Sequence, residues 1–550
     1  MNLRKKIAAA VTTVAVLGVS RSSVIASVGI RRIPIPAARH ATLVVNDTAV
    51  GGVVGDQLLS LNEAIQLANG TLSVSALSSA ERRQIKGGPP GASSRDRILI
   101  AVGTVTSPPA EENLDQSAIV TIRGNDGDTI DGQGATIQGQ NGVGLMVSSS
   151  DFTLRNVVIG GGFETGISVD PAGAALQNVT LSHIHVSPPM LTGLVVGSRV
   201  SGGSLRGLSI TDSTFDGGPA HLADLFKPWG TFDGTIAVVT LAAASARGNT
   251  VNDTVLEDVL FARNEVVGGV EGFYVDGGVG GESGASFQNA IARNIRIVGN
   301  YVHDQADAAL DLSGEEGFGN GVNCGVEKVV IADNRILTSG WGVGIWASDG
   351  FRDATFDGGF IRHVDIRGNE VTRLSDLSGR NGDTLCVLLE AGRSDYTSVA
   401  TNMSITDVRI RDNEITGCAN TGIAVHAGVA LSEGNTATGN VISDLLLERN
   451  TVQDSTTGIG LRAAYLEYGG GGVATDNLIT GVAIIDNQLF GNQTDYELVG
   501  GYARGAGTAT DNTLQDVTFS GNQSDGAVTC VAQADSGTAS GNHLEDVACP

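Results

Sequence analysis

Lysine is nearly absent from this chain: only Lys86, Lys227 and Lys328 follow residue 26. Over 550 residues the formal net charge is −25. Proteins that bind nucleic acid present a basic face to the phosphate backbone, so we expect no nucleic-acid partner. The acidity is sufficiently explained by the need to stay in solution, and a role in holding cations or basic partners remains the alternative.

Long apolar runs are also missing after the N-terminus, so we expect no transmembrane segment in the mature chain. The first residues differ from the rest, because Met1–Lys6 is basic, Ile7–Val19 is apolar and small residues lead up to Ala26. This order predicts a secretory signal peptide over residues 1–26, with a retained membrane anchor as the alternative. We therefore expect a secreted, extracellular or cell-surface protein.

Cysteine is scarce, and the spacing of the five cysteines matches no metal site, so zinc is not indicated. Cys530 and Cys549 lie in the last, incomplete repeat at positions expected to face the core. A disulfide between them is plausible in an exported protein. The odd number leaves at least one thiol unpaired.

A repeat organises the rest of the chain. Ile405–Ile415 and Ile442–Val452 carry the same pattern of apolar residues, each with an Asn near its end. Equivalent asparagines recur at steps of 36, 34, 35, 44, 37, 37 and 35 residues, at Asn264, Asn300, Asn334, Asn369, Asn413, Asn450, Asn487 and Asn522. A period of this size is typical of stacked architectures in which no unit buries its apolar face alone.

Within each repeat the apolar residues alternate, as in a β-strand. A second alternating segment follows the Asn, for example Gly422–His426, and a long surface turn is expected over about 463–478. Asn tolerates the left-handed backbone of a tight corner, and stacked Asn side chains can form a hydrogen-bonded ladder. The sequence therefore predicts an all-β fold, a right-handed parallel β-helix over residues 95–550, with coils about 4.8 Å apart.

A small helical cap is predicted before the repeats. Ser60 and Glu63 stand at the spacing of a capping box, Gly70 ends the first helix, and Ser78 and Glu81 repeat the box before a second short helix. A cover of this kind protects the first coil of a solenoid from edge-to-edge association. We assign residues 27–94 to this cap and its linker.

The segment Leu59–Asn69 resembles the CSLREA segment of exported bacterial right-handed β-helix proteins. Leu59 replaces the cysteine of that motif and Asn62 its arginine. Ala118–Gly124 and Ile130–Ile137 are similar to the opening coils of the same family and of pectin-lyase-like folds. The resemblance implies the fold but not the activity, because this fold hosts lyases, hydrolases, epimerases and adhesive surface proteins.

Known catalytic signatures of β-helix enzymes are missing, since neither Gly-His-Gly nor Asp-Pro-His occurs. Asn125–Asp131 resembles a calcium loop weakly, and an ordinary turn is the simpler interpretation. We expect no cofactor, although Ca²⁺ remains an option. The aromatic insertion at 216–235, with Phe226, Trp229 and Phe232, is expected to pack as a loop core or, alternatively, to serve as a ligand platform.

Alignment of the second segments predicts two outward columns, because equivalent positions stack in a β-helix. The first column is predicted to contain Tyr274, Asp311, Trp346, Leu388 and Ala424, and the second Asp276, Ser313, Ser348, Glu390, His426 and Arg462. An exposed strip with aromatic rings, carboxylates, a His and an Arg suits a sugar-binding groove, whereas ordinary solvated surface is the alternative.

Two functions remain open: binding of an extracellular or cell-surface polysaccharide as an adhesin or matrix protein, which we favour, and cleavage of an acidic polysaccharide by a lyase or glycoside hydrolase. For an enzyme, Glu390 and His426 would share a proton and Arg462 would pair with a uronate. Asp276 and Asp311 would act as acids or hold Ca²⁺, and Tyr274 and Trp346 would stack on sugars. We expect a monomer.

Overall fold

The computed structural model describes residues 40–107, 118–188, 191–219, 237–338, 340–350, 353–373, 384–394, 397–466, 471–503, 505–534 and 538–549. The predicted signal peptide and the aromatic residues Phe226, Trp229 and Phe232 lie outside these ranges. Arg39–Pro550 forms one compact unit. No helix among the described residues is long and apolar enough to cross a membrane.

The N-terminal part of this unit contains the two predicted helices, α1 (Leu61–Ala68) and α2 (Ser79–Arg82). Both begin at capping boxes, Ser60 with Glu63 and Ser78 with Glu81, as the sequence predicts. Strand β1 (Ala41–Val45) pairs in parallel with β3 (Arg97–Ile100), so the cap continues the sheet of the coils that follow.

Each regular coil contains four strands, two more than the repeat predicted. One complete coil consists of β30 (Ser404–Arg411), β31 (Glu414–Thr416), β32 (Thr421–Ala430) and β33 (Thr436–Thr438). The long turn expected over 463–478 is wrong, because β36 continues to Leu466 and β37 occupies Val473–Thr475.

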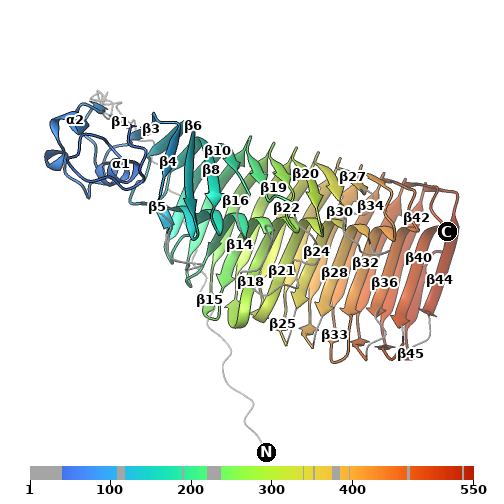
Figure 1. Cartoon of the computed structure of the whole chain (residues 1–550). Helices are drawn as coiled ribbons and strands as arrows, with labels where there is room; N and C mark the ends of the chain where they lie inside the picture. Colours follow the sequence, from blue (N-terminus) through green and yellow to red (C-terminus); the bar gives the residue numbers. More distant parts are fainter. Residues whose placement is uncertain are drawn as a thin grey trace, which may run out of the picture. The chain divides into compact units, whose positions relative to one another are not determined.

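Equivalent strands of successive coils pair in parallel, and Figure 1 shows them stacked in chain order. The long strands equivalent to β30 are β16 (Val255–Ala262), β19 (Ile291–Val298), β22 (Gly325–Ala332), β26 (Phe360–Arg367), β34 (Val441–Glu448), β38 (Leu478–Ile485) and β42 (Thr513–Ser520). The short strands equivalent to β31 are β17 (Glu265–Val267), β20 (Tyr301–Gln305), β23 (Arg335–Thr338), β27 (Glu370–Arg373), β35 (Thr451–Gln453), β39 (Gln488–Phe490) and β43 (Gln523–Ser524). With stacked parallel strands and few helices, the chain is a right-handed parallel β-helix, as predicted.

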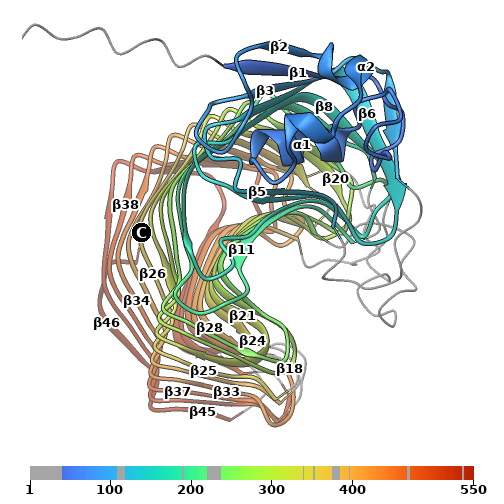
Figure 2. The same cartoon turned by 90° about the vertical axis from the view of Figure 1, so that its left-hand side faces the viewer.

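The strands equivalent to β32 carry the candidate site. They are β18 (Glu271–Gln288), β21 (Ala308–Val322), β24 (Trp341–Gly350), β28 (Leu385–Ser394), β36 (Thr457–Leu466), β40 (Thr494–Ala503) and β44 (Ala527–Ala534). Figure 2, which looks along the stack, shows the coils bending on the side that carries β21 and β24.

The asparagine ladder is present, and its side chains from Asn264 to Asn487 are buried. Asn413, for example, accepts hydrogen bonds from the backbone N and Nδ2 of Asn369 and donates to Asn450 Oδ1 at 2.9 Å. The expected left-handed backbone lies one residue earlier, at Asp412 with φ 56° and at Arg449 with φ 53°. The residue before each Asn therefore forms the corner, and the Asn contributes its side-chain amide to the hydrogen bonds of the ladder.

A second ladder, which the sequence analysis missed, passes through Asn440, Asn477, Asn512 and Asn542. This second ladder explains the bend in the strands equivalent to β32, because its amides lie directly against the backbone at the bend. A Cβ on Gly428, for example, would lie 2.4 Å from the side-chain amide of Asn477. Gly392 faces Asn440 and Gly501 faces Asn542 in the same way. Only a very small residue at the bend leaves room for the amide.

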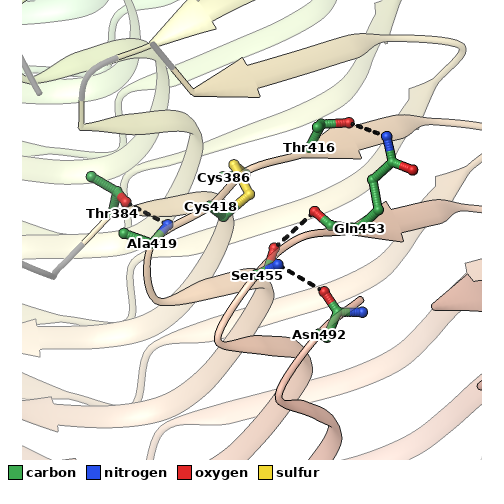
Figure 3. Close-up of a disulfide and its surroundings, with 8 residues drawn as sticks. All are labelled: Thr384, Cys386, Thr416, Cys418, Ala419, Gln453, Ser455 and Asn492. Atoms are coloured by element: carbon green, nitrogen blue, oxygen red, sulfur yellow. Dashed lines mark hydrogen bonds between the residues drawn. A yellow bond between two sulfur atoms is a disulfide. The ribbon is translucent and has the colours of Figure 1, made fainter. Parts of the chain in front are cut away.

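The predicted disulfide between Cys530 and Cys549 is present. A second one, between Cys386 and Cys418, joins β28 to the turn before β32 (Figure 3). Cys324 is the free thiol; it is buried, and its Sγ accepts a hydrogen bond from the backbone of Ala290 at 3.4 Å.

Candidate functional site

The bend divides each of the strands equivalent to β32, from β18 to β40, into two arms whose outward side chains approach one another. The arm before the bend carries the two columns that the sequence predicted. The arm after it carries Glu316, Asp349, Arg393, Val429, Tyr465 and Tyr502, which lie next to one another in the strand register or on adjacent strands. We call the surface between the two arms the concave face.

Most of the predicted columns are correct in register. Asp311 pairs with Tyr274, and the second column places Glu390 beside His426 and His426 beside Arg462. Trp346 was assigned to the wrong column, since it pairs with Ser313 and Glu390. Gly344 takes the predicted place of Trp346, and Ser348 lies beyond the bend opposite Glu315.

The expected exposure of the strip is wrong. Asp276 is 1% exposed, Asp311 2%, Glu390 4% and His426 2%, and Tyr274 and Trp346 are buried as well. The physical reason is the bend, which folds the second arm back over the first. His426, for example, is stacked on the ring of Tyr465 with centroids 4.6 Å apart. The site is thus a packed polar network with a partly exposed rim.

Glu390 and His426 form a hydrogen-bonded pair, as the column predicted, with Oε1 of Glu390 3.0 Å from Nδ1 of His426. Oε2 of Glu390 accepts a hydrogen bond from Nε1 of Trp346 at 3.0 Å. Burial opposes ionisation of Glu390, but the bond to His426 and the charge of Arg393 outweigh it and lower its pKa.

Burial also lowers the pKa of His426, against the opposing effect of Glu390. The imidazole is therefore neutral beside an ionised carboxylate, and Nδ1 carries the proton that Glu390 accepts. Within the described residues no hydrogen bond reaches Nε2 of His426, which leaves that nitrogen with a lone pair. A neutral imidazole held in one tautomer by a carboxylate can act as a general base.

Arg462 is held by the protein itself. Its Nη2 donates to Glu497 at 2.6 Å, and its guanidinium lies over the rings of Tyr465 at 4.7 Å and Tyr502 at 5.4 Å. Arg393 similarly lies over Trp341 at 4.7 Å and contacts Glu390 and Asp349. Both cations are thus already paired with carboxylates.

The other end of the concave face is acidic. Burial raises the pKa of Asp276 to about 7, against a hydrogen bond with Glu316 that lowers it. Burial, and then repulsion from neighbouring carboxylates including Asp276, raises the pKa of Glu316 well above its usual range. The same two causes act on Asp311. Asp276 and Glu316 therefore form a hydrogen-bonded acid pair that holds protons near neutral pH.

The residues predicted to hold Ca²⁺ do not form a metal centre by themselves. No group of three or more Asp, Glu, His or Cys among the described residues is placed to hold a metal ion. Asp276 is near enough to raise the pKa of Asp311, but the two belong to different columns.

A surface hollow of about 430 Å³ lies away from these strands, at β13 (Thr214–Asp216), β17 and β20. An ion pair between Arg263 and Asp212, 2.7 Å apart, forms part of its lining. It contains none of the predicted site residues.

Comparison of the sequence with protein-family models and with curated proteins gives no match. Solved structures give a likeness of architecture. The A-module of the mannuronan C-5 epimerase AlgE4 of Azotobacter vinelandii aligns with 88% of this chain and 98% of its own, at 12% identity and a TM-score of 0.35. The A-module of AlgE6 of the same organism aligns with 87% of this chain and 99% of its own, at 14% identity and a TM-score of 0.36. PfbA, a surface adhesin of Streptococcus pneumoniae, aligns over 83% of this chain and 93% of its own, at 10% identity and a TM-score of 0.32. These likenesses concern the β-helical architecture alone.

Proposed function

We propose that this protein is an exported polysaccharide-binding protein of the adhesin or matrix type, and that the polysaccharide lies along the concave face. The observation that carries this proposal is the combination of aromatic rings and hydrogen-bonding groups on one face in successive coils. Trp341 and Tyr502 are partly exposed there, beside Arg393 and Arg462 respectively. Rings with a few fixed polar groups are the usual composition of a site for an organic ligand.

Export is supported by the two disulfides, because such bonds persist in oxidising compartments. Together with the predicted signal peptide, they favour a protein that meets its ligand outside the cell.

The proposal is tested by a glycan array with the purified protein, followed by calorimetry with the best ligands. Trp341→Ala and Tyr502→Ala should each weaken binding about tenfold, since each removes a ring from the concave face. Phe490→Ala is the matched control, because Phe490 is 37% exposed on β39, outside that face. Equal effects of all three substitutions would place the ligand elsewhere.

A second candidate function, cleavage of a polysaccharide, is favoured by the geometry of Glu390 and His426. His426 would remove a proton through Nε2 while Glu390 keeps Nδ1 protonated, and the imidazolium so formed would return a proton to the leaving oxygen. The pairing of Arg462 with Glu497 reduces its capacity to hold a uronate.

Cleavage is detected by new reducing ends and by unsaturated products that absorb in the ultraviolet. Glu390→Gln and His426→Ala should each abolish any such activity while circular dichroism stays unchanged. Activity at the wild-type level in both variants would exclude this centre. Absence of products from neutral and acidic polysaccharides alike would leave binding as the function.

A further inference from the structure

Six carboxylates of three successive coils collect at one end of the concave face. They are Glu271, Asp276, Asp307, Asp311, Glu316 and Asp349. The strands β18, β21 and β24, which carry five of them, contain no Lys or Arg. Arg393 of the next coil reaches Asp349, with Nε 3.3 Å from Oδ1. Arg393 thus lies at one edge of this acidic end.

Several of these carboxylates are both buried and unsatisfied. Among the described residues, Oδ1 of Asp276, Oδ1 of Asp311 and Oε2 of Glu316 have no hydrogen-bond partner, although Asp276 and Asp311 are almost completely buried. A buried acceptor without a donor destabilises the folded protein, more so when the group is charged. Without such donors these acids hold protons near neutral pH, and a cationic donor placed beside them would allow them to ionise.

The shape of the acidic end distinguishes between donors. The described carboxylates do not converge on a single point as metal ligands do. Instead, an aromatic ring accompanies them: a Cβ on Gly344 would lie 2.0 Å from the Trp346 ring and 2.6 Å from Oδ1 of Asp311. The ring and the carboxylate thus meet above a glycine. Tyr274 adds a second ring and a hydrogen bond to Glu271.

An ammonium group fits such surroundings, because it donates three hydrogen bonds to carboxylates and is attracted to aromatic faces. We propose that the acidic end of the concave face binds the free amino groups of an amino-sugar polysaccharide. This proposal rests on the proposed function, since it names the class of glycan that the same face takes. The net charge of −25 adds a long-range attraction for a cationic polymer.

The test compares the affinities of three probes by calorimetry near neutral pH: a β-1,4-linked glucosamine oligomer, the N-acetylated oligomer of the same length, and an oligolysine of the same charge. The wild-type protein should bind the glucosamine oligomer at least about tenfold more tightly than either of the others. In Asp311→Asn the ratio between the two sugar oligomers should fall, because the substitution replaces one of the carboxylates with an uncharged amide of the same shape.

Two further variants make the result decisive. Glu316→Gln, at the partly exposed edge of the same end, should lower the ratio in the same direction even if Asp311→Asn folds poorly. Asp444→Asn is the matched control, since Asp444 is exposed on β34 and Asn accepts its left-handed backbone of φ 56°.

Each outcome is informative. Equal affinity for both sugar oligomers, or an unchanged ratio in both variants, overturns the amino-sugar proposal but leaves polysaccharide binding intact. Oligolysine binding as tight as glucosamine binding overturns it in favour of a general attraction for polycations. If no glycan of any kind binds, the proposed function fails together with this inference.

Discussion

Replacing Asp276 with Asn should stabilise the protein, and the gain should grow with pH. The carboxyl of Asp276 is 1% exposed, and burial raises its pKa from 3.8 to about 7, against the opposing hydrogen bond with Glu316. A group whose pKa is raised in the folded state takes up a proton on folding. Its contribution is fully favourable below the unfolded pKa and is lost as the pH rises through the folded pKa.

The magnitude follows from the two pKa values. At about 1.4 kcal/mol for each tenfold change in proton affinity, the rise from 3.8 to about 7 corresponds to about 4 kcal/mol. This stability is lost between about pH 4 and about pH 7 and does not fall further above that range. Asn does not ionise, so Asp276→Asn should have the wild-type stability near pH 4 and exceed it by about 4 kcal/mol near pH 8.

The assay is denaturant unfolding at several pH values, followed by tryptophan fluorescence, because Trp341 and Trp346 lie on β24 of the same face, two coils from Asp276. Glu316 and Asp311 interact with Asp276, and Glu271, Tyr274 and Asp349 interact with these two acids, so all five contribute to the pH dependence. Asp444→Asn serves as the control. Parallel pH dependences for Asp276→Asn and the wild type, or a loss of stability near pH 8, would refute the reasoning.

Three further perturbations test the scaffold. Asn413→Ala removes hydrogen bonds to both neighbouring coils and should lower the free energy of unfolding by about 2–4 kcal/mol. Asn522→Ala, at the end of the ladder, should lower it by less. Equal shifts of the denaturant midpoint in the two variants would contradict a role of the ladder in stability. Cys386→Ser removes a disulfide with a sequence separation of 32 residues and should lower the free energy of unfolding, measured by thermal melting without reductant, by about 3–4 kcal/mol. With reductant, the variant and the wild type should melt at the same temperature. Ser60→Ala should destabilise the cap by about 1 kcal/mol, seen as faster hydrogen exchange in α1 and unchanged exchange in β30; uniform exchange in the two elements would refute that effect.

The repeat made the coil predictable because the asparagine and the alternating apolar residues recur within a short stretch of sequence. The pairing of Glu390 with His426 followed, since it needs only the correct register between neighbouring coils. Trp346 was misplaced because two glycines, Gly342 and Gly344, both fit the start of the aligned segment. The resulting slip of two residues keeps a side chain on the same face of a strand, so Trp346 still lies on the concave face.

The arm of each strand that follows the bend could not be predicted from the sequence repeat. It depends on the bend, which depends on contacts such as that of Gly428 with Asn477, 49 positions further along the chain. For the same reason the sequence analysis missed Glu316, Arg393 and Tyr465 and expected an exposed strip. A signal was present, however, in a second series of asparagines that begins at Asn440 and pairs with small residues at the bend.

The central claim, that a glycan lies on the concave face, is tested most directly by hydroxyl-radical footprinting of the protein with and without its best-binding glycan. Trp341 and Tyr502 should become less reactive when the glycan is bound, because both rings are partly exposed on that face. Phe490, which is 37% exposed on β39, should react as before. Protection of Phe490 with unchanged reactivity of Trp341 and Tyr502 would contradict the account.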